Sequence, residues 1–259
     1  MKTASFPLLG YPVYCQDLSA MPQNQKLIIN TLNGHSYTVA KKDKIFSHAL
    51  RTSDILLPDG ISVVMGAKIL EGKRIKKIAG YDVFLHLLHL LEQQNGSCFF
   101  LGAMPDTLKR IKEKLETEFP HVRVGSFSPP YKPVFSEEDS RLMCEQVNLF
   151  CPDVLFVGMT APKQEKWVHE NKEKLDARIT CSIGAVFDFY AGTSERPPKW
   201  MIDMKLEWLG RLLKEPKRMW RRYLLSTPVF FIDVFRHKYG LAKNGEQSQL
   251  QNYTPNRPA

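Results

Sequence analysis

Lys163, Gln164 and Glu165 place a cation, an amide and a carboxylate side by side, directly after Pro162. Proline suits the first position of a helix, so a helix is predicted to begin here. The free N–H groups and the dipole of such an end favour an anionic ligand, and Lys163 and Gln164 could add a charge and a donor. A plain turn with a solvated helix start explains the same pattern. Taken alone, the local pattern favours that second interpretation.

Three further polar residues stand at the ends of two predicted strands. Asp59 lies between Pro58 and Gly60 after the apolar run 55–57, where its carboxylate could act as a general base on a hydroxyl. Thr31 and Asn33 flank the end of the run 27–32 and could hydrogen-bond a sugar. Pro-Asp-Gly is also a common turn, and asparagine forms turns through its own side chain. Each residue on its own therefore indicates a turn.

The elements that must position these residues follow a regular alternation. We predict strands over 27–32, 55–57, 98–101, 122–127, 153–158 and 178–183. Helices are predicted over 83–91, 105–118, 136–150 and 162–175, with further helical structure through Val39 to Leu50 and from Ile61 to Ile69. This order is typical of a Rossmann-like, doubly wound, mostly parallel α/β sheet.

Ligands of such sheets bind outside the carboxyl ends of the strands, where three glycines fall: Gly102, Gly158 and Gly184. These turns make a nucleotide pocket plausible. The sequence contains neither a GxGxxG fingerprint nor a P-loop, so no motif supports dinucleotide or ATP binding.

Composition favours an intracellular protein. Five cysteines, in mostly apolar surroundings and without metal-ligand spacing, fit a reducing compartment. Pro7, Gly10 and Pro12 interrupt the apolar start, so we expect no signal peptide. No uninterrupted apolar run reaches the roughly 18 residues of a spanning helix. We expect the chain to stay in the cytoplasm.

Nearly all of the net charge of +9 lies in one segment, because residues 196–243 hold 12 Lys or Arg against 4 Asp or Glu. Three helices are predicted there, and the third has Thr227 as its N-cap, Pro228 at its first position and Gly240 after its end. We divide the chain into an α/β catalytic domain (1–194), a basic helical appendage (195–243) and a disordered tail (244–259).

The appendage combines basic, aromatic and apolar side chains. Arg211, Arg218, Arg221 and Arg222 are interleaved with Trp208 and Trp220 beside the apolar third helix. A solvated basic face is the ordinary explanation of such charges. The apolar helix and the aromatic residues favour a foot on an anionic membrane surface over a nucleic-acid-binding face.

Together these motifs carry a family resemblance over roughly residues 27–240. The chain resembles the WecG/TagA/CpsF glycosyltransferases in the order of Thr31-Leu32-Asn33, Pro58-Asp59-Gly60, Gly80-Tyr81-Asp82, Phe100-Leu101-Gly102, Pro162-Lys163-Gln164-Glu165, Phe187-Asp188, Ala191-Gly192, Leu206-Glu207-Trp208-Leu209, Glu215-Pro216 and Arg221-Arg222-Tyr223. A series of motifs in one order is far more specific than any one of them.

The resemblance implies transfer of a hexosamine-type sugar, with inversion, from a UDP-sugar to a polyprenyl-diphosphate-linked acceptor at the inner membrane face. Cell-surface polysaccharide or teichoic acid assembly is the implied setting. It implies no cofactor and no metal, in keeping with the lack of an Asp-x-Asp pair.

By the same resemblance, Asp59 matches the catalytic base, and Thr31 and Asn33 line its pocket. Gln164 matches a donor or acceptor contact, and Lys163 and Gln164 form one wall of the pocket. We also predict that Gly102, at a strand end of the same rim, and Glu165 bind substrate. The arginines at 211, 218, 221 and 222 approach the diphosphate. Thr160 and Ser182 depart from the pattern, because family members usually have glycine at the first position and often at the second.

Two competing classes are a basic nucleic-acid-binding α/β protein and a Rossmann-type oxidoreductase. The missing glycine fingerprint disfavours the oxidoreductase. The sequence leaves the donor sugar, the acceptor and any oligomer open.

Overall fold

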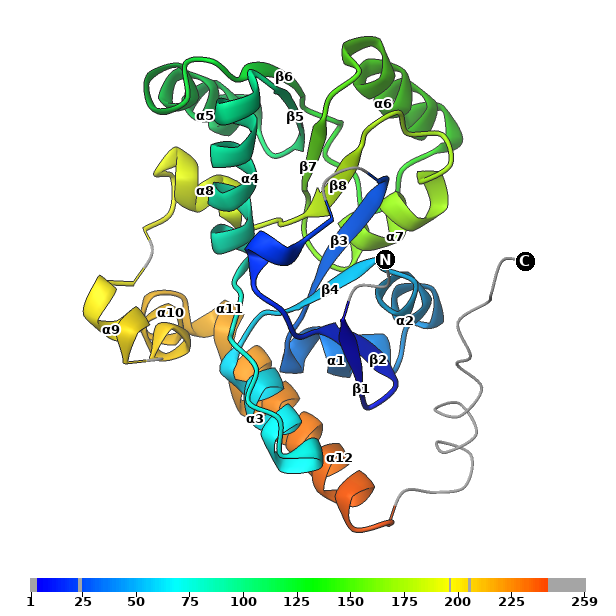
Figure 1. The fold of residues 1–259 in the computed structure, drawn as a ribbon, viewed down its shortest axis with the longest axis vertical. Helices are drawn as coiled ribbons and strands as arrows, with labels where there is room; N and C mark the ends of the chain where they lie inside the picture. Colours follow the sequence, from blue (N-terminus) through cyan, green and yellow to red (C-terminus); the bar gives the residue numbers. More distant parts are fainter. Residues whose placement is uncertain (1–3, 23–24, 196, 205, 242–259) are drawn as a thin grey trace.

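The computed structural model of the chain describes residues 4–22, 25–195, 197–204 and 206–241. A sheet of eight strands runs through its centre in the order β1-β2-β4-β3-β8-β7-β5-β6 (Figure 1). The strands are β1 (Ser5–Leu8), β2 (Tyr11–Tyr14), β3 (Leu27–Leu32), β4 (Ile55–Pro58), β5 (Ser97–Gly102), β6 (Arg123–Phe127), β7 (Val154–Gly158) and β8 (Ile179–Ser182). Among the strands of the described residues, only β1 and β2 pair antiparallel. The predicted doubly wound, mostly parallel α/β fold is confirmed.

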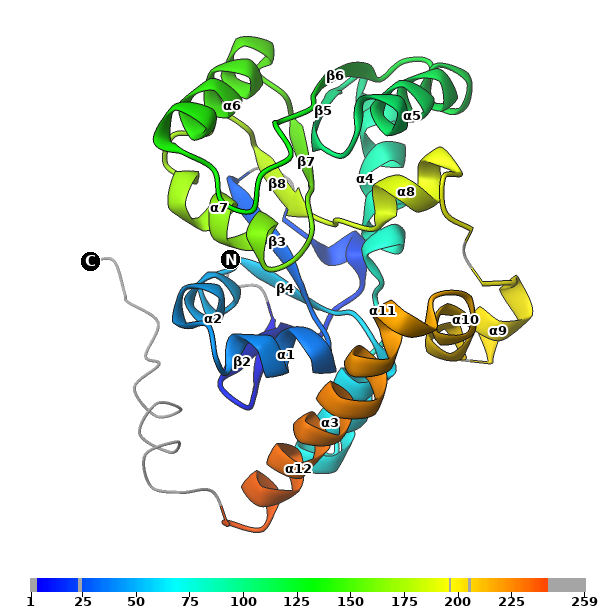
Figure 2. The same ribbon diagram turned by 180° about the vertical axis from the view of Figure 1, so that it is seen from behind.

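Helices cover both faces of this sheet (Figures 1 and 2). They are α1 (Gly34–Ala40), α2 (Lys44–Arg51), α3 (Ile61–Glu71), α4 (Gly80–Gln94), α5 (Pro105–Glu118), α6 (Glu137–Phe150), α7 (Lys163–Asn171), α8 (Val186–Ala191), α9 (Lys199–Asp203), α10 (Glu207–Lys214), α11 (Pro216–Trp220) and α12 (Thr227–Lys238). Apolar residues of α4, α5 and α8 share one core with the sheet, while α6 and α7 close a second and α1, α2 and α12 a third. Strands β4, β5, β7 and β8 are therefore buried on both faces, as continuous apolar runs predict.

Several predicted helices have different bounds in the structure, and the helix expected over 83–91 is the longer α4, Gly80–Gln94. The helix expected over 162–175 is α7, which begins at Lys163 and ends at Asn171. The helical stretch through Val39 and Leu50 is two helices, because the Asp43 side chain accepts a hydrogen bond from the Phe46 N–H at 3.0 Å and starts α2.

The hairpin of β1 and β2 was not predicted, because its prolines read as interruptions. Pro7 and Pro12 lie opposite each other in the register, and Pro7 is on the edge strand β1, where a missing N–H is tolerated. Leu9 and Gly10 make the turn with φ of 49° and 79°. Positive φ at both turn residues suits a tight hairpin.

The C-terminal helices depart from the prediction in how they are joined. A π-helical turn, Arg221–Ser226, continues α11 directly into α12. Thr227 is therefore not an N-cap; it lies within the helix at φ −65° and ψ −44°, and its hydroxyl donates to the Arg222 carbonyl at 3.4 Å. The predicted first helix is split into α9 and α10. Gly240, at φ +67°, follows the last helix as expected.

Helix α12 lies along α3, and the two project from the sheet side by side (Figures 1 and 2). Gly66 on α3 permits this approach, since a Cβ there would stand 2.9 Å from the Phe230 ring. Phe230 and Val234 are buried with Leu32 and Leu56 of the sheet. Helix α12 thus completes the core of the N-terminal half.

The domain division at residue 194 stays a prediction, and the tail at 244–259 lies outside the described residues. All five cysteines are free thiols. Among the described residues, no helix is both long and apolar enough to cross a membrane.

Candidate active site

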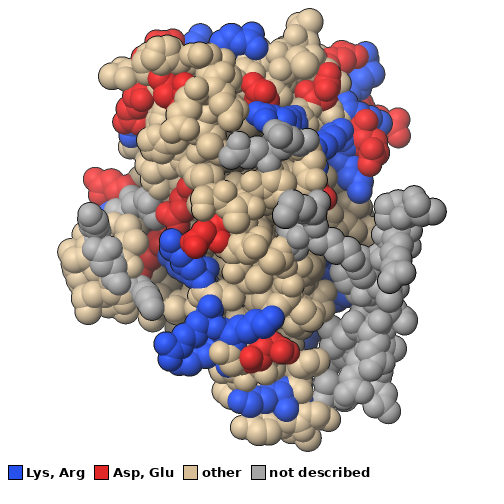
Figure 3. Space-filling view, in the orientation of Figure 1, with Lys and Arg blue, Asp and Glu red and all other residues tan. Residues whose placement is uncertain are grey.

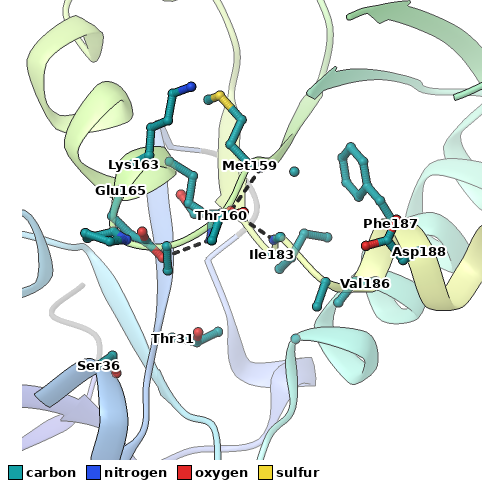
Figure 4. A pocket seen from close by; sticks show the side chains of 18 of the residues that line it. Thr31, Ser36, Met159, Thr160, Lys163, Glu165, Ile183, Val186, Phe187 and Asp188 are labelled. Carbon is teal, nitrogen blue, oxygen red and sulfur yellow. Dashed lines mark hydrogen bonds between the residues drawn. The ribbon is translucent and has the colours of Figure 1, made fainter. Parts of the chain in front are cut away.

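A pocket of about 830 Å³ opens at the carboxyl ends of the parallel strands (Figure 4). This volume is typical of a small-molecule site. Residues that follow β3, β4, β5, β6, β7 and β8 line it, together with side chains from α10, α11 and the π-helical turn. Segments far apart in the sequence, near residues 31, 59, 163 and 222, therefore meet around one cavity.

Asp59 is held at the end of β4 by the neighbouring strand. Its N–H donates to the Leu32 carbonyl at 2.9 Å, and Leu32 pairs with Pro58 in the register. Gly60, at φ +131°, turns the chain into α3 immediately afterwards. This conformation favours glycine. The Pro-Asp-Gly turn therefore presents the Asp59 carboxylate beside the Thr31-Leu32-Asn33 segment.

The charges around Asp59 come mainly from the C-terminal helices. Burial is the largest influence and raises the pKa of the Asp59 carboxyl above its ordinary value. The positive charges of Arg222, Lys77 and Arg211 oppose this rise in the pKa. The Glu207 carboxylate adds to it, while pairing with the Lys77 ammonium at 2.7 Å. The pocket thus combines a proton acceptor of raised basicity with cations close by.

Thr31 and Asn33 both line the pocket, as predicted. The Asn33 Oδ1 atom accepts from the N–H groups of His35 and Ser36 at 3.1 and 3.0 Å, so it caps α1. The side-chain oxygen of Asn33 therefore bonds the local backbone, as the turn interpretation predicts. Its Nδ2 has no hydrogen-bond partner within the described part of the chain, which leaves it as a donor in the pocket wall.

Gln164 joins two loops of the pocket rim. Its Oε1 accepts from the Met159 N–H at 3.2 Å, after β7, and from the Gly184 N–H at 3.1 Å, after β8. Its Nε2 donates to Glu165 Oε1 at 2.9 Å. Figure 4 shows these bonds at the centre of the site. The side chain thus fixes the shape of the rim as well as lining it.

Glu165 is almost completely buried, with 2% of its surface exposed. Burial raises the pKa of its carboxyl to about 7, against the opposing effect of the hydrogen bond from Gln164. The Oε2 atom of Glu165 and the Oγ atom of Ser182, both buried in the pocket wall, have no hydrogen-bond partner among the described residues. At neutral pH Glu165 therefore holds its proton for a large part of the time.

Lys163 extends beside Met159 and away from Thr31 and Ser36 (Figure 4). Its ammonium lies 3.6 Å from the centre of the Phe135 ring and donates to the Lys132 carbonyl. Burial lowers the pKa of this ammonium. Lys163 lines the pocket as predicted, and it also fastens the loop after β6 to the start of α7.

The predicted arginines do not all reach the pocket. Arg211 and Arg222 line it, and the Arg211 guanidinium lies 5.3 Å from the centre of the Phe189 ring. Arg221 is exposed and lies over the Trp220 ring at 5.4 Å, outside the lining. Arg218 stands on α11, and its side chain lies outside the described residues.

Gly102 ends β5 but is not part of the lining. A Cβ on Gly102 would come within 2.6 Å of the Gly158 carbonyl on the paired strand. Its position therefore reflects the close approach of two strand ends. The neighbouring Ala103 and Met104 contact the pocket in its place.

Several residues of the site were given no role from the sequence. His35, Ser36 and Tyr81 line the pocket, and so does Glu207 on α10. Tyr81 and Glu207 belong to motifs of the family resemblance, whereas only the spacing of His35 and Ser36 just after Asn33 could have marked those two. The described residues hold no group of three or more His, Cys, Asp or Glu side chains arranged for a metal ion.

Comparison with known proteins identifies the family. The profile of the glycosyl transferase WecG/TagA/CpsF family matches residues 7–244. The chain belongs to this family of glycosyltransferases. The resemblance of the motifs is thereby confirmed, and glycosyl transfer is favoured over the oxidoreductase and nucleic-acid-binding classes.

Relatives in this WecG/TagA/CpsF family share most of the chain. A protein of Bacillus subtilis (strain 168) is 33% identical over 211 residues, which cover 82% of this chain and 80% of the relative. One of Bacillus spizizenii is 31% identical, covering 90% and 88%. One of Staphylococcus aureus (strain MW2) is 24% identical, covering 93% and 96%. All three are named N-acetylglucosaminyldiphosphoundecaprenol N-acetyl-beta-D-mannosaminyltransferase.

Proposed function

We propose that this glycosyltransferase moves an N-acetylhexosamine, of the N-acetylmannosamine type, from a UDP-sugar to a saccharide carried on a polyprenyl diphosphate. The relatives' names state such a transfer to a diphosphoundecaprenol-linked N-acetylglucosamine, and the product they name is a β-linkage. Inversion at the anomeric carbon of an α-linked donor gives that product. The resulting lipid-linked saccharide would be used in the assembly of a teichoic acid or another surface polysaccharide.

The observation that carries this proposal is the meeting of Asp59 with Arg211 and Arg222 in one pocket. Asp59 acts as the general base: it accepts the proton of the acceptor hydroxyl as the oxygen attacks the anomeric carbon. A carboxylate of raised pKa is a better proton acceptor than an ordinary one, which suits it to this step.

The arginines stabilise the leaving UDP. As its bond to the sugar breaks, negative charge grows on the diphosphate, and a planar guanidinium can pair with two of its oxygens. Arg211 and Arg222 line the pocket and supply this charge. We propose that Arg218 also stabilises the leaving UDP. Arg221, on the exposed side of the π-helical turn, is better placed for a partner outside the pocket.

The remaining wall residues hold the two substrates. Thr31 and the Nδ2 donor of Asn33 contact the sugar groups beside Asp59. Gln164 positions the rim through its bonds to Met159 and Gly184, and Glu165 fixes the Gln164 amide.

We further propose that α12 and α3 form a foot on the inner face of the cell membrane, where the lipid-linked acceptor lies. Helix α12 exposes Val229, Ile232 and Phe235 at 36%, 49% and 45%. Figure 3 shows Lys and Arg side chains gathered over the region of α3. Exposed bases here are Lys68, Lys73, Arg74 and Lys76, none of which belongs to the predicted appendage. Apolar and basic groups at one end of the molecule fit an anionic bilayer surface.

A transfer assay tests the proposed reaction. The purified chain is given radiolabelled UDP-N-acetylmannosamine and a short-chain lipid diphosphate that carries N-acetylglucosamine. We expect a disaccharide on the lipid and release of UDP, with UDP-glucose and UDP-N-acetylglucosamine as competing donors. Failure to transfer any of these sugars to the lipid acceptor would overturn the proposal.

A further inference from the structure

The pocket has two chemically different ends. Its charged end, beside β4, holds Asp59, Glu207, Arg211 and Arg222. Its opposite end lies beyond β7, at the loops after β5 and β6, where apolar and aromatic side chains prevail. These are Met104, Pro129, Pro130, Tyr131, Pro133 and Phe135. Four strands separate β4 from β6 in the sheet, so the two ends stand well apart.

The loop that forms the apolar end is fixed on both sides of Tyr131. Before it, the Ser128 hydroxyl donates to the Ala103 carbonyl at 2.8 Å. After it, the Lys132 ammonium bonds both carboxylate oxygens of Asp139 at 2.9 and 2.8 Å. The Lys163 ammonium binds the Lys132 carbonyl and covers the Phe135 ring. The backbone that carries Tyr131 is therefore held at a set place on the rim.

The Tyr131 side chain contrasts with its fastened backbone. It lines the pocket, yet 99% of its surface is exposed. Among the described residues, the ring has neither a hydrogen bond nor a ring contact. Every other aromatic side chain of the lining is buried or contacts another side chain. Phe46 and Phe187 are buried, and Tyr81 packs on Phe84. The Phe135 ring lies against the Lys163 ammonium, and the Phe189 ring against the Arg211 guanidinium. Tyr131 is the aromatic ring of the described lining that offers an open face.

We propose that Tyr131 forms the stacking surface for the base of the donor nucleotide. The inference rests on the proposed use of a UDP-sugar, which is itself a two-ended molecule: a planar base at one end, and a charged diphosphate with the sugar at the other. The base lies on Tyr131 at the apolar end. The diphosphate then extends toward Arg211 and Arg222, and the anomeric carbon toward Asp59.

Stacking on an aromatic ring is available to every base, so Tyr131 contributes affinity for the nucleotide while other contacts choose uracil. The ring also explains the fastening of the loop. A stacking surface held in place loses little freedom when the ligand binds, and this improves affinity.

Calorimetric titrations with UDP and with inorganic diphosphate test the inference. Tyr131→Ala should weaken UDP binding roughly ten- to a hundredfold, the range expected for one base stacked on an aromatic ring. Binding of inorganic diphosphate should change less than about twofold, because it has no base to stack. Tyr131→Phe keeps the ring and should bind UDP like the parent protein.

Val134→Ala is the matched control, since Val134 is 79% exposed on the same loop and outside the lining. It should leave UDP binding unchanged. Normal UDP affinity in Tyr131→Ala, or an equal loss for UDP and diphosphate, would overturn the stacking role alone. If the parent protein binds no UDP, both the proposed UDP-sugar donor and the stacking role of Tyr131 are overturned.

Discussion

The Nδ1 atom of His35 lies 2.9 Å from the Oγ atom of Ser226, which joins the start of α1 to the π-helical turn. The Thr38 hydroxyl adds a bond to the Ser226 carbonyl at 3.0 Å. Arg222 stands four residues earlier on the same turn and reaches into the pocket. Helix α1 begins at its cap Asn33, so one short segment both forms the pocket wall and holds the arginine-bearing turn in place.

His35→Ala should therefore reduce transfer by misplacing Arg222. We expect kcat to fall about tenfold and stability to fall by about 1 kcal/mol, the usual contribution of one hydrogen bond. Steady-state kinetics and thermal unfolding measure the two effects. His121→Ala is the control, because His121 pairs with Glu92 on the surface away from the pocket. An unchanged kcat in His35→Ala would show that the turn does not depend on this bond.

Asp59→Asn should remove the base and leave the fold intact. We expect kcat to fall about a hundred- to ten-thousandfold, the usual contribution of a positioned general base. Thermal stability should hold or rise, because the variant no longer buries a carboxylate. In the parent protein, the raised pKa of Asp59 shifts the acidic limb of the kcat/KM profile above the ordinary carboxyl range. Near-normal turnover in Asp59→Asn would reject the assignment.

Much of this site could be predicted, because parallel strands bring their carboxyl ends to one edge. Thr31 lies at the end of β3, and Asp59 and Lys163 come after the ends of β4 and β7, so the alternation of elements alone places them together. Arg222 was predicted from the family resemblance, yet its direction depends on the π-helical turn, which no local pattern revealed. Arg221 and Arg222 are adjacent in sequence, and only the helix packing decides that one faces the pocket and the other Trp220.

Glu165 should make stability depend on pH. Its folded-state pKa, about 7, is raised above the ordinary 4.5, so between these values the folded chain holds a proton that the unfolded chain has lost. The contribution of Glu165 to the free energy of unfolding should therefore be largest below about pH 4.5. It should decline as pH rises toward 7 and level off above that value. The loss is on the order of 3 kcal/mol.

Glu165→Gln should remove this component of the pH dependence, because glutamine carries no titrating proton. Chemical denaturation across the pH range measures it. Glu116→Gln, at an exposed position on α5, should keep the dependence of the parent protein. A Glu165→Gln variant with the parent's pH profile would contradict the buried proton.

Gly158→Ala should disturb the rim at the end of β7. The added Cβ would stand 2.3 Å from the ring of Phe187, which is 1% exposed and has no free space to retreat into. We expect a loss of about 1–3 kcal/mol from overpacking. Phe187→Leu combined with Gly158→Ala should recover part of it, since the smaller side chain restores room. Additive losses in the double variant would show that the two positions do not interact.

The membrane foot is tested best by point substitutions, because deleting the C-terminal helices would also remove the buried Phe230 and Val234 from the core. Ile232→Ser with Phe235→Ser removes two exposed apolar side chains from α12. We expect binding to vesicles of phosphatidylglycerol and phosphatidylcholine to weaken by at least about tenfold, with the fold intact by circular dichroism.

Leu149→Ser is the matched control for this foot, since Leu149 is 85% exposed and belongs to α6, a helix that lies away from α3 and α12 (Figure 1). Vesicle sedimentation should be the same for this variant as for the parent protein. Added salt should weaken binding of the parent, because it screens Lys68, Lys73 and Arg74 from the anionic lipid. Binding that withstands both the double substitution and salt would place the membrane contact elsewhere on the molecule.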